Sequence, residues 1–329
     1  MKKLINQPGA FVDEVISSIV DVHPELRTSP ASKRVVTRTG GTPPGQVGIV
    51  TGGGFGHLPL FLGYVGGGLC AAAAVGNVFS SPSSEEMLIA TREADSGAGV
   101  LHLYGNYGGD VLNFELAAED AAAEGIAVRT VLGTDDVFSA ALPEDRRGVA
   151  GLALVCKIAG AAAARGDSLD QVAAIAQRAA DHTRTAGVGL SPTYLPTTGK
   201  PTFTLADDEM EIGVGIHGEP GSERITIETA DAVADRLMDA IFADAAPAAG
   251  DRVALLVNGL GATPAEELYL LTARARARLH KQNVTVAHTY VGHYATSLEM
   301  AGASVTVTTL GDDLAPLIAA PAHSPLVRF

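Results

Sequence analysis

Tryptophan is absent from the sequence, and aromatic residues make up only 5% of it, although hydrophobic residues make up 47%. Alanine, valine, leucine and glycine must therefore do most of the packing. Cores of small side chains are typical of helices packed closely against parallel sheets, so the composition favours an α/β fold. The length of 329 residues suits about two domains.

Basic residues are also scarce. The chain has 23 lysines and arginines against 37 acidic residues, which gives a formal net charge of −14. A protein that binds nucleic acid needs a basic face, so we exclude a nucleic-acid partner. The negative charge favours a soluble protein of the cytoplasm.

Cysteine is limited to Cys70 and Cys156, each within an apolar run. We interpret them as small buried hydrophobic residues, because two isolated cysteines make neither a disulfide framework nor a metal site. No HxxxH or CxxC spacing occurs, so we predict no metal in this chain. The opening residues do not resemble a signal peptide, and the longest apolar stretch, 149–164, is too short to cross a bilayer. We therefore expect a cytoplasmic protein without membrane contact.

Strand-like segments, glycine-rich loops and helical patterns alternate along the chain. This order predicts two α/β domains, residues 1–185 and 186–329, with largely parallel or mixed sheets flanked by helices. Whether the last strands return to the first domain stays open. We expect helices at 11–22, 111–123, 169–185, 230–243 and 264–280, and strands at 47–50, 100–104, 128–132, 253–257, 284–290 and 304–310.

Three glycine-rich loops hold candidate functional groups, and ligands of open α/β sheets bind beyond the carboxyl ends of strands. The first loop, GGGFGHLP at 52–59, includes His57. Its successive backbone N–H groups could cradle an anion or a ligand oxygen. It is not a nucleotide-binding P-loop, because no Gly-Lys-Ser/Thr follows. A purely structural turn is the alternative.

The second loop places Asp110 after two glycines and directly before a predicted helix. An aspartate in this position is usually a helix N-cap. The functional alternative is a general base that accepts a proton from a hydroxyl group.

The third loop, GVGIHGEPG at 213–221, sets His217 among four glycines. Glycine permits close backbone approach to a ligand, and a neutral imidazole has a lone pair that can act as nucleophile or base. An incidental histidine in a turn is the alternative. His102, His288 and His293 lie in or beside predicted strands, and we interpret them as structural or as supporting the site.

Several segments together resemble the substrate-binding (DhaK) subunit of dihydroxyacetone kinases, over nearly the whole chain. The strongest are KPTFTLAD at 200–207, continuing to Gly221, and LVNGLGATP at 256–264. The resemblance also covers residues 1–6, 52–59, 106–110 and 113–115.

The resemblance implies a phosphotransferase of carbohydrate metabolism that acts on a short-chain ketose. His217 would attack the ketone carbon and form a hemiaminal, Asp110 would accept the proton of the terminal hydroxyl, and His57 would hydrogen-bond the substrate. Further substrate contacts are expected from Gly53, Gly54, Phe55, Gly56, Ser81, Gly105 and Asn106.

The resemblance also implies partners. This chain would bind no cofactor itself, because ATP, or ADP rephosphorylated by a phosphotransferase-system protein, would sit with magnesium on a separate nucleotide-binding subunit. A homodimer is expected on the same ground.

The sequence departs from the family pattern at three positions. Phe55 and Leu58 replace the serine and glutamate of the usual GGGSGHEP, and Gly105 replaces a common lysine. The opened volume could be refilled or capped by Phe55. The YGNY sequence at 104–107 resembles relatives that act on four-carbon ketoses such as erythrulose, so dihydroxyacetone and a larger ketose both stay open. A ketose-sensing coactivator and an isomerase are the alternative functions.

Overall fold

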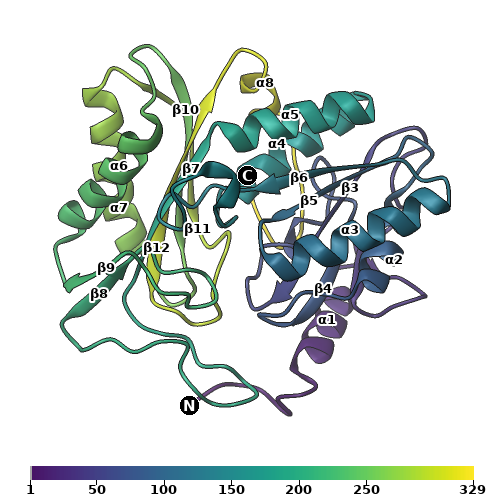
Figure 1. Cartoon of the computed structure of the whole chain (residues 1–329), viewed down its shortest axis with the longest axis horizontal. Coiled ribbons are helices and arrows are strands. Elements are labelled where there is room, and N and C mark those ends of the chain that lie inside the picture. The colour runs from purple at the N-terminus through teal and green to yellow at the C-terminus, as the bar shows by residue number, and fades with distance from the viewer. Residues whose placement is uncertain (1) are drawn as a thin grey trace. The chain divides into compact units, whose positions relative to one another are not determined.

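The computed structural model describes residues 2–329, and the chain divides into two compact units (Figure 1). The first unit takes the chain up to residue 133 and adds 155–178 and 320–329, and the second takes 134–154 and 179–319. The units therefore interleave, whereas we predicted a single break near residue 185. The division passes through helices α4 (Leu152–Arg165) and α5 (Leu169–Asp181).

The sheet of the first unit is six-stranded, in the order β1-β2-β4-β3-β5-β6. Strands β4, β3, β5 and β6 run parallel, and β1 and β2 add an antiparallel edge. The strands are β1 (Leu26–Thr28), β2 (Val35–Arg38), β3 (Gly48–Phe55), β4 (Ala72–Val78), β5 (Val100–Gly105) and β6 (Val128–Gly133). The helices that precede or connect them are α1 (Phe11–Val22), α2 (Ser84–Ala94) and α3 (Gly108–Ala123), with a short 3-10 turn at Leu62–Tyr64.

Both faces of this sheet are buried, and small side chains make that possible. Along β4, Ala72 and Ala74 join the core formed with α2 and α3, whereas Ala73 and Val75 join the core formed with α1. This is the alternation expected of a strand, with apolar residues on both sides as in parallel sheets. The predicted small-residue α/β packing is confirmed for this unit.

The sheet of the second unit is also six-stranded, in the order β11-β10-β12-β7-β8-β9. Only β10 and β11 pair in parallel, and the other neighbours are antiparallel, so this sheet is mixed. The strands are β7 (Thr183–Gly189), β8 (Glu209–Ile212), β9 (Glu223–Thr226), β10 (Arg252–Gly259), β11 (Thr285–Gly292) and β12 (Gly302–Leu310). Helices α6 (Ala230–Ala245) and α7 (Ala265–Lys281) complete the unit, together with a short 3-10 turn at Pro143–Asp145 and the short helix α8 (Ala315–Ile318).

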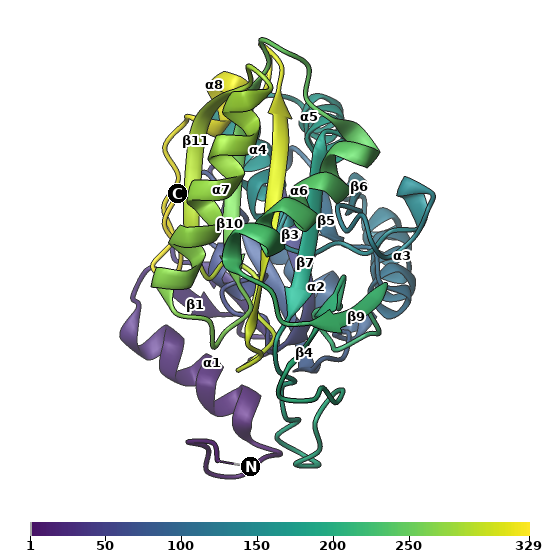
Figure 2. The same ribbon diagram turned by 90° about the vertical axis from the view of Figure 1, so that its left-hand side faces the viewer.

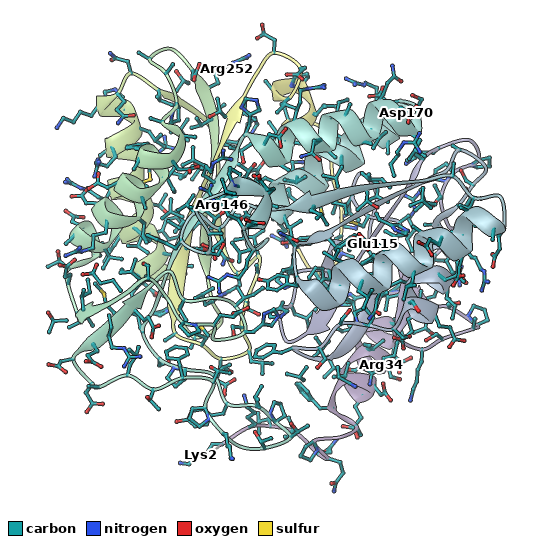
Figure 3. All side chains as sticks on the ribbon, in the orientation of Figure 1. Lys2, Arg34, Glu115, Arg146, Asp170 and Arg252 are labelled. Atoms are coloured by element: carbon teal, nitrogen blue, oxygen red, sulfur yellow. The ribbon has the colours of Figure 1, made fainter. Side chains whose placement is uncertain are left out.

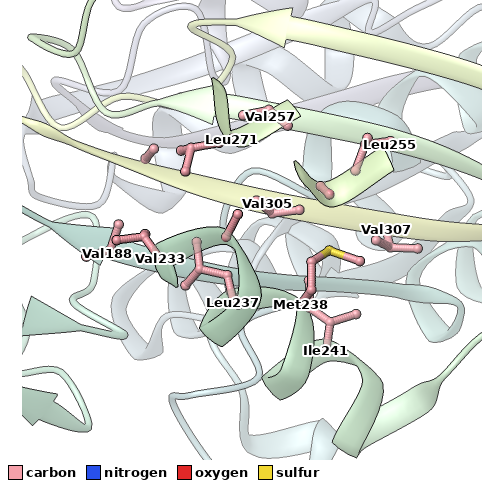
Figure 4. Packing of buried hydrophobic residues seen from close by; sticks show 14 of the residues in the cluster. Val188, Val233, Leu237, Met238, Ile241, Leu255, Val257, Leu271, Val305 and Val307 are labelled. Atoms are coloured by element: carbon pink, nitrogen blue, oxygen red, sulfur yellow. The ribbon is translucent and has the colours of Figure 1, made fainter. Parts of the chain in front are cut away.

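Helices α6 and α7 lie side by side over one face of this sheet (Figure 2). Helix α6 directs Val233, Leu237 and Ile241 to the sheet at intervals of four residues, which is the spacing of one helix face. They contact alternate residues of the central strands, including Val305 and Val307 of β12 (Figure 4). The result is a contiguous aliphatic core within the second unit.

Three predicted boundaries are wrong. The expected helix at 169–185 ends at Asp181, because β7 begins at Thr183 and pairs with β12. The expected glycine loop at 52–54 belongs to strand β3, where Gly53 pairs with Val75 of β4. Pro264 is the N-cap of α7 and not its first helical residue. Across residues 2–329, no helix has the length and apolar character needed to span a membrane.

Candidate functional site

His217 lies in the loop of a β-hairpin formed by β8 and β9 in the second unit. The loop folds back because Gly218 N–H donates to the carbonyl of Gly215 at 2.9 Å, and Gly215 N–H donates to the carbonyl of Glu219 at 3.0 Å. Gly213 and Gly218 have φ values of 78° and 82°. These left-handed conformations favour glycine, which explains the glycine-rich sequence around the histidine.

A carboxylate holds the imidazole of His217. Atom Nδ1 of His217 lies 2.8 Å from Oε1 of Glu219, and the backbone N–H of His217 donates to Oε2 at 2.9 Å. Because a carboxylate accepts hydrogen bonds, this contact assigns the proton of a neutral imidazole to Nδ1. The lone pair then resides on Nε2. The His217 side chain is 24% exposed, so a small molecule can reach the ring.

The Glu219 carboxylate is stabilised in its charged form. Burial opposes ionisation, but the hydrogen bond and charge of His217, with the charge of Arg147, lower the pKa of Glu219 to about 2. Atom Nη1 of Arg147 lies 3.6 Å from Oε2 of Glu219. Glu219 is therefore an anion throughout the physiological pH range.

The rest of the hairpin fixes the loop in place. Val214 and Ile216 are 7% and 4% exposed, so the side chains on either side of Gly215 point inward. Glu211 of β8 accepts a hydrogen bond from Gly221 N–H at 2.7 Å and forms an ion pair with Arg224 at 3.1 Å. The end of the loop at Gly221 is thereby tied to strand β8.

In the first unit, His57 follows the end of strand β3. Its ring is 1% exposed and stacks on Phe79 with centroids 5.0 Å apart and planes inclined by 14°. Phe61 meets it edge-on at 6.3 Å. A side chain at Gly53 would overlap the ring of Phe61, and one at Gly54 would crowd the backbone of Ser80. These glycines are therefore required for packing, and their substrate contacts remain a prediction about their backbone atoms.

Phe55 and Leu58 replace polar family residues, and both pack in the apolar core beneath α1. The ring of Phe55 is 4% exposed and meets Phe11 edge-on, with centroids 5.7 Å apart. The side chain thus points into the core and does not refill the space at Gly105. Only the backbone of Phe55 remains available for the predicted substrate contact, as for Gly56 beside it.

Asp110 is the third residue of helix α3. The N-cap of α3 is Tyr107, which makes no side-chain capping bond, so the N-cap interpretation of Asp110 is wrong. The carboxyl group is 5% exposed and lies in the first helical turn, where the helix dipole favours a negative charge. Burial, with the nearby charges of Glu115 and Asp110, raises the pKa of Tyr104. Asp110 is thus a buried acid at the end of β5.

Three other predicted substrate contacts gather around this end of the first sheet. Gly105 ends β5 opposite Gly133, and Asn106 N–H donates to the carbonyl of Gly133 at 3.1 Å. Ser81 follows β4, and its hydroxyl lies 3.3 Å from Nδ2 of Asn113 on α3. The loops after β4 and β5 therefore bring Ser81 next to the helix that carries Asp110, as the parallel arrangement predicts.

His102 and His293 make contacts within the fold. His102 is buried, its Nε2 atom lies 2.8 Å from the Thr91 hydroxyl, and burial lowers its pKa to about 3. Nδ1 of His293 lies 3.0 Å from the carbonyl of Gly259. Within the described part of the chain, no cluster of three or more acidic, histidine or cysteine side chains could hold a metal ion.

Glu219 and Arg147 are the residues that the sequence reasoning missed. Glu219 was visible as the one acid in the His217 loop, two positions after the histidine. Arg147 had no local signal, because it stands 66 positions before Gly213 and no motif links it to the loop.

 Only the fold places the guanidinium of Arg147 beside the His217 loop, since residues 134–154 belong to the same unit as the hairpin.

A family model and several known proteins match most or all of this chain. The Dak1 domain matches residues 17–326. A PTS-dependent dihydroxyacetone kinase 2, dihydroxyacetone-binding subunit DhaK, of Listeria innocua is 44% identical, with 100% of this chain and 99% of the relative covered. An L-erythrulose 1-kinase of Mycolicibacterium smegmatis is 43% identical and covers all of this chain, but the match spans only 58% of that kinase.

A solved structure described as the dihydroxyacetone kinase operon co-activator Dha-DhaQ superposes with a TM-score of 0.89 at 34% identity, covering 94% of this chain and 96% of the other. Its fold agrees with the two α/β units described above. The chain belongs to the Dak1 family, with relatives among both DhaK subunits and erythrulose kinases.

Proposed function

We propose that this chain is the ketose-binding subunit of a dihydroxyacetone-type kinase. It holds a short-chain ketose covalently on His217 and presents the primary hydroxyl for phosphoryl transfer from a separate nucleotide-binding subunit. The full-length similarity to a dihydroxyacetone-binding subunit supports the subunit assignment. The proposal includes a homodimer that works in the cytoplasm, with ATP, or ADP rephosphorylated in place, and magnesium held by the partner subunit.

The contact between Glu219 and Nδ1 of His217 is the observation that carries this proposal. With the proton on Nδ1, the lone pair of Nε2 attacks the ketone carbon and forms the N–C bond. The π electrons of the carbonyl move to its oxygen, which takes a proton from solvent and becomes a hydroxyl. The ring proton on Nδ1 passes to Glu219 and on to solvent, so the adduct is a neutral hemiaminal. Fixing the ketose in this way offsets part of the entropic barrier to the later phosphoryl transfer.

Asp110 supplies the second step in this scheme. As a carboxylate, it accepts the proton of the ketose hydroxyl while the oxygen attacks the transferred phosphoryl group. His57, held between Phe79 and Phe61, donates or accepts a hydrogen bond to the ketose. Because glycerol has no electrophilic carbon, the hemiaminal selects ketoses over polyols.

Intact-protein mass spectrometry tests the tether. Wild-type protein incubated at neutral pH with dihydroxyacetone or with erythrulose is expected to gain the full mass of one ketose, because a hemiaminal forms without loss of water. His217→Ala is expected to gain nothing. His280→Ala removes an exposed histidine of the same unit and serves as the matched control. An adduct that persists in His217→Ala would contradict the proposal.

A regulatory function is the second candidate, because a structural neighbour at a TM-score of 0.89 is described as an operon co-activator. A sensor needs the ketose site but no general base. The buried carboxylate of Asp110 favours the kinase, since burying an acid in the first turn of α3 has a cost that a sensor gains nothing from.

A further inference from the structure

Arg147 lies behind the His217 loop and binds three groups at once. Its guanidinium makes an ion pair with Asp136 at 2.8 Å, donates to the carbonyl of Gly213 at 3.2 Å, and lies 3.6 Å from Oε2 of Glu219. The Arg147 side chain is 15% exposed and that of Asp136 is 5% exposed. We refer to Arg147 with these three partners as the Arg147 clamp.

The backbone that carries the clamp is itself fixed. Arg147 N–H donates to the Ser139 hydroxyl at 3.0 Å, and Asp136 N–H donates to the Arg147 carbonyl at 3.1 Å. The segment is tied to strand β7, because Val137 N–H donates to the carbonyl of Thr185 at 3.0 Å. The preceding residue, labelled in Figure 3, is Arg146, whose ion pair with Asp244 of α6 measures 2.6 Å. The guanidinium of Arg147 therefore projects from a rigid support.

The loop is shaped to receive the clamp. A side chain at Gly215 would overlap both Oε2 of Glu219 and Nη1 of Arg147, and one at Gly213 would overlap Phe138. The absence of a Cβ atom at Gly215 lets the two charged groups approach across the loop backbone. The clamp thus holds one oxygen of Glu219, while the other oxygen contacts Nδ1 of His217.

We propose that Arg147 is a positioning residue for the ketose tether, which holds the Glu219 carboxylate so that His217 keeps its proton on Nδ1 and its lone pair on Nε2. This inference rests on the proposed function. A planar guanidinium can bind a carboxylate, a carbonyl and a second carboxylate together, whereas an ammonium group cannot match that geometry. Without the clamp, the Glu219 carboxylate keeps only its contacts with His217, and the imidazole can adopt the other tautomer.

Nitrogen-15 NMR of the ligand-free protein tests the positioning directly, because the two imidazole tautomers have different nitrogen shifts. Wild-type His217 is expected to be protonated at Nδ1 when neutral. In Arg147→Gln, the Nε2-protonated form is expected to grow. The rate of adduct formation with dihydroxyacetone is expected to fall about 10–100-fold, the range found when a partner that orients a metal-bound histidine is removed. Arg147→Lys is expected to lie between the two.

Arg236→Gln is the matched control, because Arg236 pairs with Glu228 at 2.7 Å in the same unit and touches none of the loop residues named above. It should leave both the tautomer and the adduct rate unchanged. A wild-type tautomer and adduct rate in Arg147→Gln would overturn the inference. If that variant does not fold, Arg147→Lys decides by the same two readouts. Failure of wild-type protein to form any adduct would contradict the proposed function. The tautomer measurement would still test whether the Arg147 clamp orients His217.

Discussion

At the residue scale, the glycine-rich sequence around His217 predicted an imidazole presented to a ligand. The structure adds the two residues that orient this imidazole, Glu219 and Arg147. Glu219 could have been found from the sequence, because an acid two residues after a histidine in a tight turn can reach the ring. Arg147 could not, since its effect depends on a contact with Glu219, 72 positions further along the chain. Asp110 shows the opposite case: its position before a predicted helix favoured an N-cap, whereas the structure places it buried in the first helical turn, which agrees with the base that the family resemblance implies.

Asp136 gives a pH-dependent prediction at this scale. Burial raises its pKa to about 6, although Arg147 opposes the shift. The folded state therefore holds the proton more tightly than the unfolded chain, whose aspartates have a pKa of about 3.9. The contribution of Asp136 to stability is greatest below pH 4 and is lost as the pH rises through 6.

We expect Asp136→Asn to gain stability relative to wild type as the pH rises from 4 to 6, by up to about 3 kcal/mol, and then to level off. Urea unfolding of both proteins at several pH values measures the difference. Asp239→Asn, an exposed acid of α6, is the control. A difference that does not change with pH would refute the assigned titration.

At the element scale, alternation and helical spacing predicted helices α1, α3, α5, α6 and α7 and half of the strands, because their apolar faces are local properties of the sequence. The glycines at 52–54 were assigned to a loop since glycine usually weakens a strand. The strand nevertheless continues through these glycines. They are needed there because side chains would collide with the neighbouring Ala74, Phe61 and Phe79. The pairing of β7 with β12 joins residues more than 100 positions apart, which no local pattern could predict.

The hairpin loop between β8 and β9 gives a prediction for one element. Gly215→Ala is expected to abolish the ketose adduct while leaving the fold intact, because a methyl group there displaces Glu219 or Arg147. Intact mass and circular dichroism measure the two effects. Gly187→Ala in β7 is the control, since its added methyl would meet ordinary contacts at 3.5 Å or more. An adduct of wild-type yield in Gly215→Ala would show that the loop tolerates the change.

At the scale of the whole molecule, composition predicted an α/β protein of two parts, and the structure has two α/β units. The sequence did not reveal that the parts interleave, because residues 134–154 carry no mark of the unit that they join. The mixed second sheet was likewise left open between parallel and mixed, since crossover direction depends on tertiary pairing.

The proposed separation of ketose binding and nucleotide binding between two subunits leads to a prediction for the complete kinase. With a family nucleotide-binding subunit, ATP and magnesium, wild-type protein should phosphorylate the ketose, and Asp110→Asn should lose about 10²–10⁴-fold in turnover but keep the adduct. Asp120→Asn, an exposed acid of the same helix, is the control. Normal turnover in Asp110→Asn would count against its role as a base. Turnover of the ketose by the isolated chain would favour isomerisation instead.

The central claim is the bond between Nε2 of His217 and the ketone carbon. It is tested most directly by NMR of protein with ¹⁵N-labelled histidine and dihydroxyacetone labelled with ¹³C at the carbonyl. The account predicts a bound tetrahedral carbon that shows one-bond coupling to a histidine nitrogen in wild-type protein and in His280→Ala, and none in His217→Ala. A bound ketose that keeps its trigonal carbonyl carbon, or a tetrahedral carbon without nitrogen coupling, would contradict it.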